Sequence, residues 1–257
     1  MKILALDSSG LVASAAVVTE DAVLAEYSTN YQKTHSQTLL PMLDAIVQMT
    51  DTKLNEMDAI AVTAGPGSFT GLRIGSATVK GLGQALSKPI VSVPTTLALA
   101  WNFAGCEAVV CPLMDARRSQ VYTGLYAWNR ETKQMDGLTS QMAVPVEEIV
   151  ERVNALGRPV IYLGDGLGVY RAILEEKTKV EYTFAPVHQR FQSGGSVAAC
   201  ALSYLQNNFA GRNLCEAAGK EVSENEVRLV DAASFVPVYL RKSQAERERE
   251  EQENKAK

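Results

Sequence analysis

The stretch at residues 59–75, AIAVTAGPGSFTGLRIG, constrains the fold more than any other part of the chain. A short apolar run rich in β-branched residues ends at Gly65, Pro66 and Gly67, and a long helical pattern follows. A strand, a glycine turn and a helix in this order are typical of an open α/β sheet, whose functional edge lies at the strand ends. Ser68 or Thr70 is expected to cap the helix and to leave free N–H groups at which an anion can dock.

The helix after this turn is rich in glycine. Each interior glycine costs about 1 kcal/mol relative to alanine, and the run at 71–86 holds Gly71, Gly75, Gly81 and Gly83. On a helical wheel one narrow stripe collects Gly71, Gly75, Thr78, Leu82 and Ala85. Such a stripe allows another backbone to approach closely. Two interpretations stay open: the helix packs on its own sheet, or a second helix, from another protein, lies along the stripe.

A second helix is predicted over residues 34–50. Its apolar side chains cover about half of a helical wheel, which is wider than a one-sided surface helix needs: Leu39, Leu40, Met42, Leu43, Ile46, Val47 and Met49. Pro41 lies near its first turn or at a kink. The helix is either wedged between the sheet and the loops, or it has one internal face and one face for a partner.

Composition limits the class of protein. The 257 residues suggest two domains, and 46% hydrophobic with 21% charged residues is ordinary for a soluble globular protein. The sequence shows neither a membrane-spanning apolar run nor a signal peptide, and the four cysteines lack C-x-x-C spacing, so we expect a cytoplasmic protein with reduced thiols. A net charge of −4 argues against direct, strong nucleic-acid binding.

The order of predicted elements repeats. Each half has a three-stranded meander, a helix, a strand, a glycine turn and a helix. In the first half the strands and helices are expected at residues 2–6, 14–18, 23–28, 34–50, 59–64 and 71–86; in the second half they are expected at residues 109–114, 121–128, 138–144, 146–156, 159–163 and 170–177, with 129–137 as a turn. The repeat predicts two similar α/β domains that face each other across a cleft.

We therefore expect a first domain at residues 1–104 and a second, smaller one at 105–240. The apolar helix from about residue 194 is expected to pack back on the first domain, and 235–240 to lie extended on the body. Residues 243–257 are almost all charged or amide-bearing, which predicts a disordered tail.

In each half an aspartate, Asp7 or Asp115, ends the first strand. Duplicated domains with this feature have the outline of actin-like (ribonuclease-H-like, ASKHA) ATPases and sugar kinases. Here Ser8 and Ser9 follow Asp7, and no glycine follows Asp115, so a phosphate could approach the backbone less closely. The candidate nucleotide-binding residues are Asp7, Ser8, Ser9 and Asp115. We therefore expect a degenerate active site in an actin-like α/β fold with mixed sheets.

Metal and nucleophile chemistry have little support in the sequence. The only histidines are His35 and His188, and neither belongs to an H-x-x-x-H or H-E-x-x-H pattern. We expect His35 to form a local hydrogen bond and not to bind a metal. No G-x-S-x-G elbow or recognisable cysteine nucleophile is present.

Four segments resemble the TsaB (YeaZ) family: ILALDSS at 3–9, HSQTLLPMLD at 35–44, DAIAVTAGPGSFTGLRIG at 58–75 and MDAR at 114–117. The resemblance covers roughly the first 125 residues well and the rest loosely, through PVYLR at 237–241. It implies a non-catalytic, pseudo-enzyme subunit of the bacterial machinery that forms threonylcarbamoyladenosine next to the tRNA anticodon. The catalytic sister protein, TsaD, binds metal through an H-x-x-x-H motif, and Thr95 and Leu99 stand at the corresponding positions here.

The resemblance also implies that the chain binds TsaD through the two helices of its first domain, with the ATPase TsaE as a third member. The partner-binding set is His35, Leu39, Leu40, Met42, Leu43, Gly71, Arg73, Ile74, Gly75, Ala77, Thr78 and Gly81. We expect a homodimer in isolation, tRNA contact mainly through the partners, no cofactor bound by this chain alone, and ATP at most at an interface of the complex. The alternative is an actin-like ATPase or kinase that uses Asp7 and Asp115 with magnesium.

Overall fold

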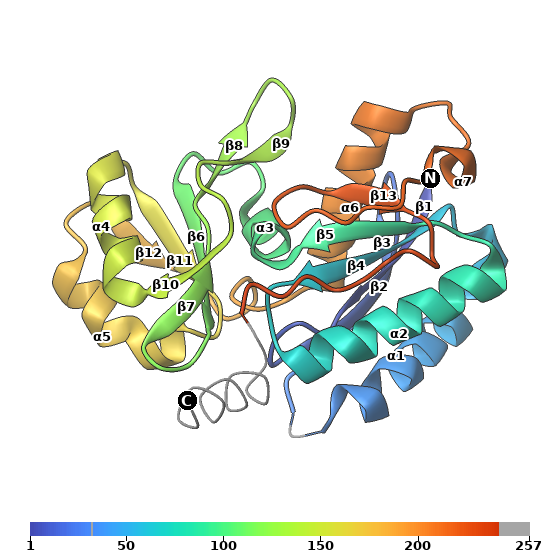
Figure 1. The fold of residues 1–257 in the computed structure, drawn as a ribbon, viewed down its shortest axis with the longest axis horizontal. Coiled ribbons are helices and arrows are strands. Elements are labelled where there is room, and N and C mark those ends of the chain that lie inside the picture. Colours follow the sequence, from blue (N-terminus) through green and yellow to red (C-terminus); the bar gives the residue numbers. More distant parts are fainter. Residues whose placement is uncertain (32, 242–257) are drawn as a thin grey trace, which may run out of the picture.

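The computed structural model describes residues 1–31 and 33–241. Two bodies lie side by side, each built on its own mixed β-sheet (Figure 1). The predicted tail at 243–257 lies outside the described residues. Within the described ranges no helix combines the length and the apolarity that a membrane crossing needs.

The first sheet has the strand order β13-β5-β4-β1-β2-β3. Its strands are β1 (Lys2–Asp7), β2 (Ala13–Thr19), β3 (Val23–Thr29), β4 (Ala59–Gly65), β5 (Ile90–Pro94) and β13 (Arg228–Val230). β1, β4 and β5 run parallel, whereas β2, β3 and β13 pair antiparallel with their neighbours. Every residue of β4 is buried, as its continuous apolar sequence predicts for a central strand covered on both faces.

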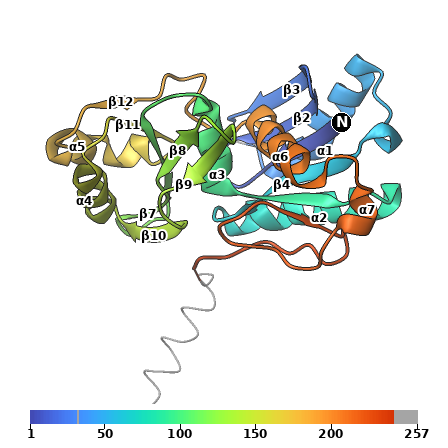
Figure 2. The same ribbon diagram turned by 90° about the horizontal axis from the view of Figure 1, so that it is seen from above.

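Helices cover both faces of this sheet (Figure 2). Because side chains alternate along a strand, Leu4 and Leu6 of β1 pack with α1 (His35–Thr50) and α2 (Phe69–Leu86). Ile3 and Ala5 point to the opposite face and pack with α3 (Thr95–Ala100) and α6 (Gly194–Phe209). The short α7 (Leu214–Ala217) follows α6, and single 3₁₀ turns, η1 and η2, lie at Leu54–Glu56 and Trp101–Phe103.

The second sheet has the order β10-β7-β6-β11-β12, with β8 and β9 off this path. The strands are β6 (Val109–Asp115), β7 (Gln120–Thr123), β8 (Tyr126–Asn129), β9 (Gln134–Gly137), β10 (Met142–Pro145), β11 (Val160–Leu163) and β12 (Tyr182–Phe184); α4 (Val146–Leu156) and α5 (Leu167–Lys177) accompany them. This order matches β3-β2-β1-β4-β5 of the first sheet strand for strand. The chain thus has two tandem actin-like domains, as the repeat of elements predicts.

The second meander differs from its prediction. The strand expected at 121–128 is two strands, because the chain leaves β7 at Gly124, where an added Cβ would lie 2.8 Å from the Tyr126 hydroxyl. β9 lies within the residues expected to form a turn, and it pairs with β8 as a hairpin that also reaches β6. α5 begins at Leu167, three residues earlier than expected, and β12 had no predicted counterpart.

The chain returns to the first domain after β12. α6 packs on β1 and β2, and β13 pairs with β5 at the edge of the first sheet. The second body therefore ends near residue 193 and not at 240, because the apolar faces of α6 and β13 are buried on the first sheet. Residues 235–241 have no regular structure and lie over the base of α2.

Candidate functional site

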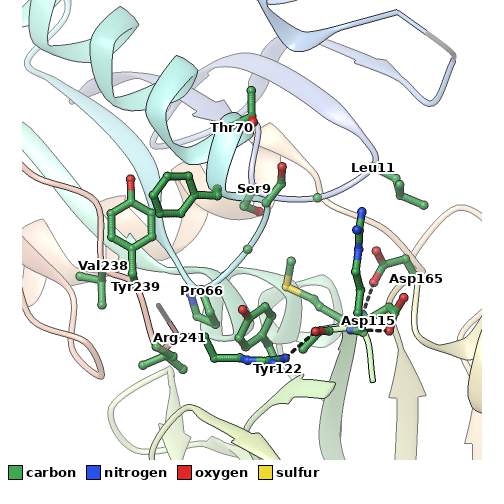
Figure 3. A pocket seen from close by; sticks show the side chains of 18 of the residues that line it. Ser9, Leu11, Pro66, Thr70, Asp115, Tyr122, Asp165, Val238, Tyr239 and Arg241 are labelled. Carbon is green, nitrogen blue, oxygen red and sulfur yellow. Dashed lines mark hydrogen bonds between the residues drawn. The ribbon is translucent and has the colours of Figure 1, made fainter. Parts of the chain in front are cut away.

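A cavity of about 570 Å³ lies between the two domains, at the carboxyl ends of β1, β4 and β6 (Figure 3). The first domain contributes the β1–β2 turn and the turn before α2. The second domain contributes the β6–β7 turn and Asp165. The C-terminal segment 238–241 forms the remaining wall. The expected cleft thus exists, at the sheet edge where α/β folds bind ligands.

The glycine stripe of α2 faces the chain's own β1–β2 turn. A Cβ on Gly71 would lie 2.0 Å from the Ser8 carbonyl oxygen, and one on Gly75 would lie 2.5 Å from the Ser8 hydroxyl. The Ser8 hydroxyl donates to the Gly71 carbonyl at 2.9 Å. Of the two interpretations of the stripe, the structure supports close packing within the chain at these two positions.

Ser68 caps α2 as predicted, because the Gly71 N–H donates to its Oγ at 3.2 Å. The N–H of Ser68 itself donates to the Ser9 carbonyl at 2.7 Å. His35 Nε2 donates to the Gly10 carbonyl at 2.8 Å, which is the local hydrogen bond expected of this histidine. Contacts from α1 and from the start of α2 therefore hold the β1–β2 turn in place. The Ser68 N–H, which could otherwise have bound an anion, is already hydrogen-bonded.

Asp7 lies behind the cavity wall and not in it. Its side chain is 1% exposed, and its Oδ1 accepts hydrogen bonds from the Ser9 N–H at 2.8 Å and the Ser9 hydroxyl at 2.6 Å. Burial raises the pKa of this carboxyl above its ordinary value, although the bonds from Ser9 oppose the rise. Of the candidate nucleotide-binding residues, Ser9 and Asp115 line the cavity, whereas Asp7 and Ser8 are buried beneath it.

Asp115 is exposed in the cavity, beside an acidic residue that the sequence analysis did not select. Its backbone N–H donates to Asp165 Oδ1 at 3.1 Å, and its own Oδ1 accepts from the Arg117 N–H at 2.9 Å and the Tyr170 hydroxyl at 3.1 Å. Burial, together with the nearby Asp115 charge, raises the pKa of Asp165. Burial and the hydrogen bond to Asp115 raise the pKa of Tyr170 to about 12. Two adjacent carboxyl groups make this wall unfavourable for phosphate.

The C-terminal segment connects the cavity to α2. Tyr239 packs on Phe69 with 4.5 Å between ring centroids, and the Arg73 guanidinium lies 4.1 Å from the centroid of the same Phe69 ring. Val238 N–H donates to the Ala64 carbonyl at 2.7 Å. Arg241 Nη1 reaches the second domain and donates to the Ala116 carbonyl at 2.6 Å. The sequence suggested an extended segment here, but it gave no sign that Tyr239 and Arg241 bridge two domains.

Thr95 and Leu99, which the family resemblance aligns with metal ligands, lie in α3 and are both buried. Among residues 1–31 and 33–241, no group of three histidine, cysteine, aspartate or glutamate side chains is arranged to hold a metal ion.

The predicted partner-binding set divides by exposure. Leu39, Met42, Leu43, Gly71 and Gly75 are buried within the first domain, so a docked protein could not reach them in this conformation. His35, Ile74 and Thr78 are half-buried. The surface of the two helices presents Leu40, Arg73, Ala77 and Gly81. The buried members fill the domain's own core, which explains the width of the apolar face of α1.

Comparison with known proteins gives concordant matches. A family model described as "TsaD: tRNA N6-adenosine threonylcarbamoyltransferase" matches residues 22–249. A Bacillus subtilis protein named tRNA threonylcarbamoyladenosine biosynthesis protein TsaB is 34% identical over 180 residues, which are 68% of this chain and 76% of that protein. An Escherichia coli protein of the same name is 29% identical over 230 residues, 83% of this chain and 98% of that protein.

A solved Pseudomonas aeruginosa structure, described as an uncharacterized protein with similarity to peptidase YEAZ, superimposes with a TM-score of 0.73 at 25% identity. The match covers 93% of this chain and 99% of that one. A second structure, YeaZ from Pseudomonas aeruginosa, superimposes with a TM-score of 0.72 over the same shares.

Proposed function

The chain belongs to the TsaB (YeaZ) family, and we propose that it is a non-catalytic subunit in the biosynthesis of threonylcarbamoyladenosine in tRNA. In this role it holds and activates a TsaD protein, with TsaE as a further member of the complex. The names of its Bacillus and Escherichia relatives support the pathway. The match to the TsaD family model supports a duplicated fold shared with the partner.

The main support for the non-catalytic role is that the two aspartates at the cleft are hydrogen-bonded within their own turns. The Asp7 carboxylate accepts hydrogen bonds from the turn that follows it, and Asp115 accepts from its own turn. The N–H groups of Ser9 and Arg117, which could otherwise meet a phosphate, donate to these carboxyl groups. Carboxyl groups of Asp115 and Asp165 add negative charge where phosphates would lie. A site of this kind offers little stabilisation to an anionic substrate.

The exposed surface of α1 and α2 supports docking of TsaD. It presents Leu40, 54% exposed, and the small residues Ala77 and Gly81 one turn apart on α2. Small residues let a second helix approach closely, and an exposed apolar surface gains free energy when it is covered. In isolation the same surface is expected to pair two copies of the chain.

Replacing Ala77 with tryptophan tests this role. The side chain points outward, so the bulky ring blocks a docking helix without disturbing the core. The matched control is Ala172→Trp, an exposed alanine within α5 of the second domain. We expect TsaD to co-purify with the control and not with Ala77→Trp, while both variants keep the circular dichroism of the unchanged chain. Equal co-purification of the two variants would count against this docking surface.

An actin-like ATPase or kinase is the second candidate. The inter-domain cavity favours it, because a magnesium ion held by the carboxyl groups of Asp115 and Asp165 would offset the negative charge that otherwise disfavours phosphate there. Calorimetry of the isolated chain with magnesium-ATP separates the two. Micromolar binding that disappears in Asp7→Ala and Asp115→Ala would replace the scaffold role with an enzymatic one.

The remaining properties follow from this role. We propose a cytoplasmic location and no cofactor bound by this chain alone. Direct contact with tRNA is left mainly to the partners, which suits a pI near 5.4. Size-exclusion chromatography with and without TsaD tests both self-association and the stoichiometry of the complex.

A further inference from the structure

Arg73 lies on the exposed surface of α2 in an unusual environment. The side chain is exposed, yet its guanidinium is held over the Phe69 ring, and Tyr239 supports that ring from the C-terminal segment. Among the described residues Arg73 forms no ion pair. An arginine stacked on an aromatic ring keeps its planar set of donors in one orientation, so little side-chain entropy is lost when it binds a carboxylate.

The second domain supplies a comparison. Arg171 of α5 also lies over an aromatic ring, 4.4 Å from the centroid of Phe184, and is likewise exposed. Its Nε, however, is 2.8 Å from Glu175 Oε1, one helical turn further along. Arg171 is therefore neutralised within its own helix. Arg73 has the same aromatic support, but residues 1–31 and 33–241 give it no counter-charge.

The neighbours of Arg73 do not supply that charge. α2 contains no acidic residue, and its other cation, Lys80, donates to the Phe235 carbonyl at 3.0 Å. α1 contains one acidic residue, Asp44, whose Oδ2 accepts from Gln48 at 2.7 Å. Further along the same line of α2 lie the small residues Ala77 and Gly81. A protein that covers this surface would remove Arg73 from water, and burying a charge without a partner is strongly unfavourable.

We propose that Arg73 is the polar anchor of this surface, and that the protein that docks there presents a carboxylate to it. The inference rests on the proposed function, because it takes the docking protein to be TsaD. Phe69 and Tyr239 act as positioning residues that orient the guanidinium before docking. Arginine and aromatic residues are enriched among the few side chains that dominate binding energy, which suits this cluster.

Binding of the full chain to TsaD from the same organism, measured by surface plasmon resonance at two salt concentrations, tests the inference. Arg73→Gln is expected to weaken binding about 30-fold and to reduce its salt dependence, because the lost contact is charge-assisted. Arg73→Lys keeps the charge and loses the planar guanidinium. Its affinity for TsaD is expected to lie between those of the unchanged chain and Arg73→Gln. Arg171→Gln is the matched control and is expected to bind as the unchanged chain does.

Two changes at Tyr239 test the positioning role. Tyr239→Leu removes the support beneath Phe69 and is expected to raise the dissociation rate several-fold, while the salt dependence stays that of the unchanged chain. Tyr239→Phe keeps the stack and is expected to have no effect. Melting temperatures of all variants show whether any loss of binding reflects unfolding.

Distinct results separate the possible failures. Binding of Arg73→Gln within threefold of the unchanged chain would overturn the anchor and leave the proposed function standing. If the unchanged chain fails to bind TsaD, the proposed function and the anchor fall together. A carboxylate on TsaD whose change to lysine restores the binding of Arg73→Glu would identify the group that meets Arg73.

Discussion

The two domains share one strand order, yet they treat the aspartate at the end of the first strand in opposite ways. Asp7, at the end of β1, is 1% exposed and lies beneath the base of α2. Asp115, at the end of β6, is exposed in the inter-domain cavity. The same topology therefore gives one covered carboxyl and one open carboxyl.

The glycine contacts of the two domains differ as well. In the first domain a Cβ on Gly67 would lie 2.3 Å from the Ser9 carbonyl, so the turn before α2 packs on residues that follow Asp7. In the second domain a Cβ on Gly166 would lie 2.9 Å from the Leu113 carbonyl, which precedes Asp115. The two turns therefore pack at different positions along the strand that ends in the aspartate, and in the second domain Asp165 of that turn accepts from the Asp115 N–H at 3.1 Å. This difference in packing accompanies the difference in exposure.

Glycine-to-alanine changes in the two helices should show the largest contrast. Gly71→Ala places a Cβ 2.0 Å from a backbone oxygen, so we expect a loss of about 3 kcal/mol in the free energy of unfolding. At Gly168 in α5 the nearest atom to an added Cβ is 3.8 Å away, and alanine there should gain up to about 1 kcal/mol. Urea denaturation measures both. Equal effects would show that the two helix bases are packed alike.

Gln141, from the second domain, tests how firmly the two domains are joined. Its Oε1 accepts from the Thr96 N–H at 3.0 Å and hydroxyl at 2.7 Å, and its Nε2 donates to the Gly65 carbonyl at 3.3 Å. Gln141→Ala leaves buried polar groups without partners and is expected to cost about 2 kcal/mol. Calorimetry of the Gln141→Ala variant should show the two domains melting in separate steps. A single unshifted transition would contradict the role of this residue as a link.

Aromatic pairs in the two domains allow a smaller test. Tyr239→Leu removes the stack on Phe69 and is expected to cost about 1 kcal/mol in stability. Tyr182→Leu removes the pair with Phe184, whose centroids are 5.5 Å apart, and should cost a similar amount. Only the first change should increase hydrogen exchange at the N-terminal end of α2, because Tyr239, unlike Tyr182, packs on that end of the helix. Matching exchange profiles would argue against this difference.

The smallest effect is expected from Asp7→Asn, measured as stability against pH. Because burial raises the pKa of Asp7 in the folded protein above 3.8, folding favours the protonated carboxyl. Its stabilising contribution is complete below the unfolded pKa and is lost as pH rises through the folded pKa. Asparagine does not titrate, so the variant should gain stability relative to the unchanged chain as the pH rises above 3.8. A difference that is constant over this range would contradict the burial argument.

Much of the fold could be predicted from sequence because its signals are local. Apolar runs marked β1, β4 and β6 as buried strands, and the duplicated order of elements predicted two related domains. The meander of the second domain was predicted less well. The chain leaves β7 at Gly124, and the residue pattern over 121–128 does not predict a break there.

The candidate site was predicted only in part. The sequence selected Ser9 and Asp115, which line the cavity, but it did not select Asp165, Tyr239 or Arg241. The last two come from a segment that follows α6 and crosses back over the cleft, so no spacing in the sequence relates them to Asp115. A helical wheel also could not predict that Arg73 is exposed while Gly71 and Gly75 are buried, because it does not show which face of the helix packs on the rest of the domain.

By itself the sequence determined most of the strands and helices and the duplicated architecture, since these depend on residue type and local period. Tertiary structure alone decided which carboxyl is covered and which face of α1 and α2 remains exposed. Those outcomes depend on close packing between segments distant in sequence, such as Ser8 against Gly71, where an added Cβ would lie 2.0 Å from the Ser8 carbonyl oxygen. Close packing at that scale is set by how the elements meet, and neither element encodes it alone.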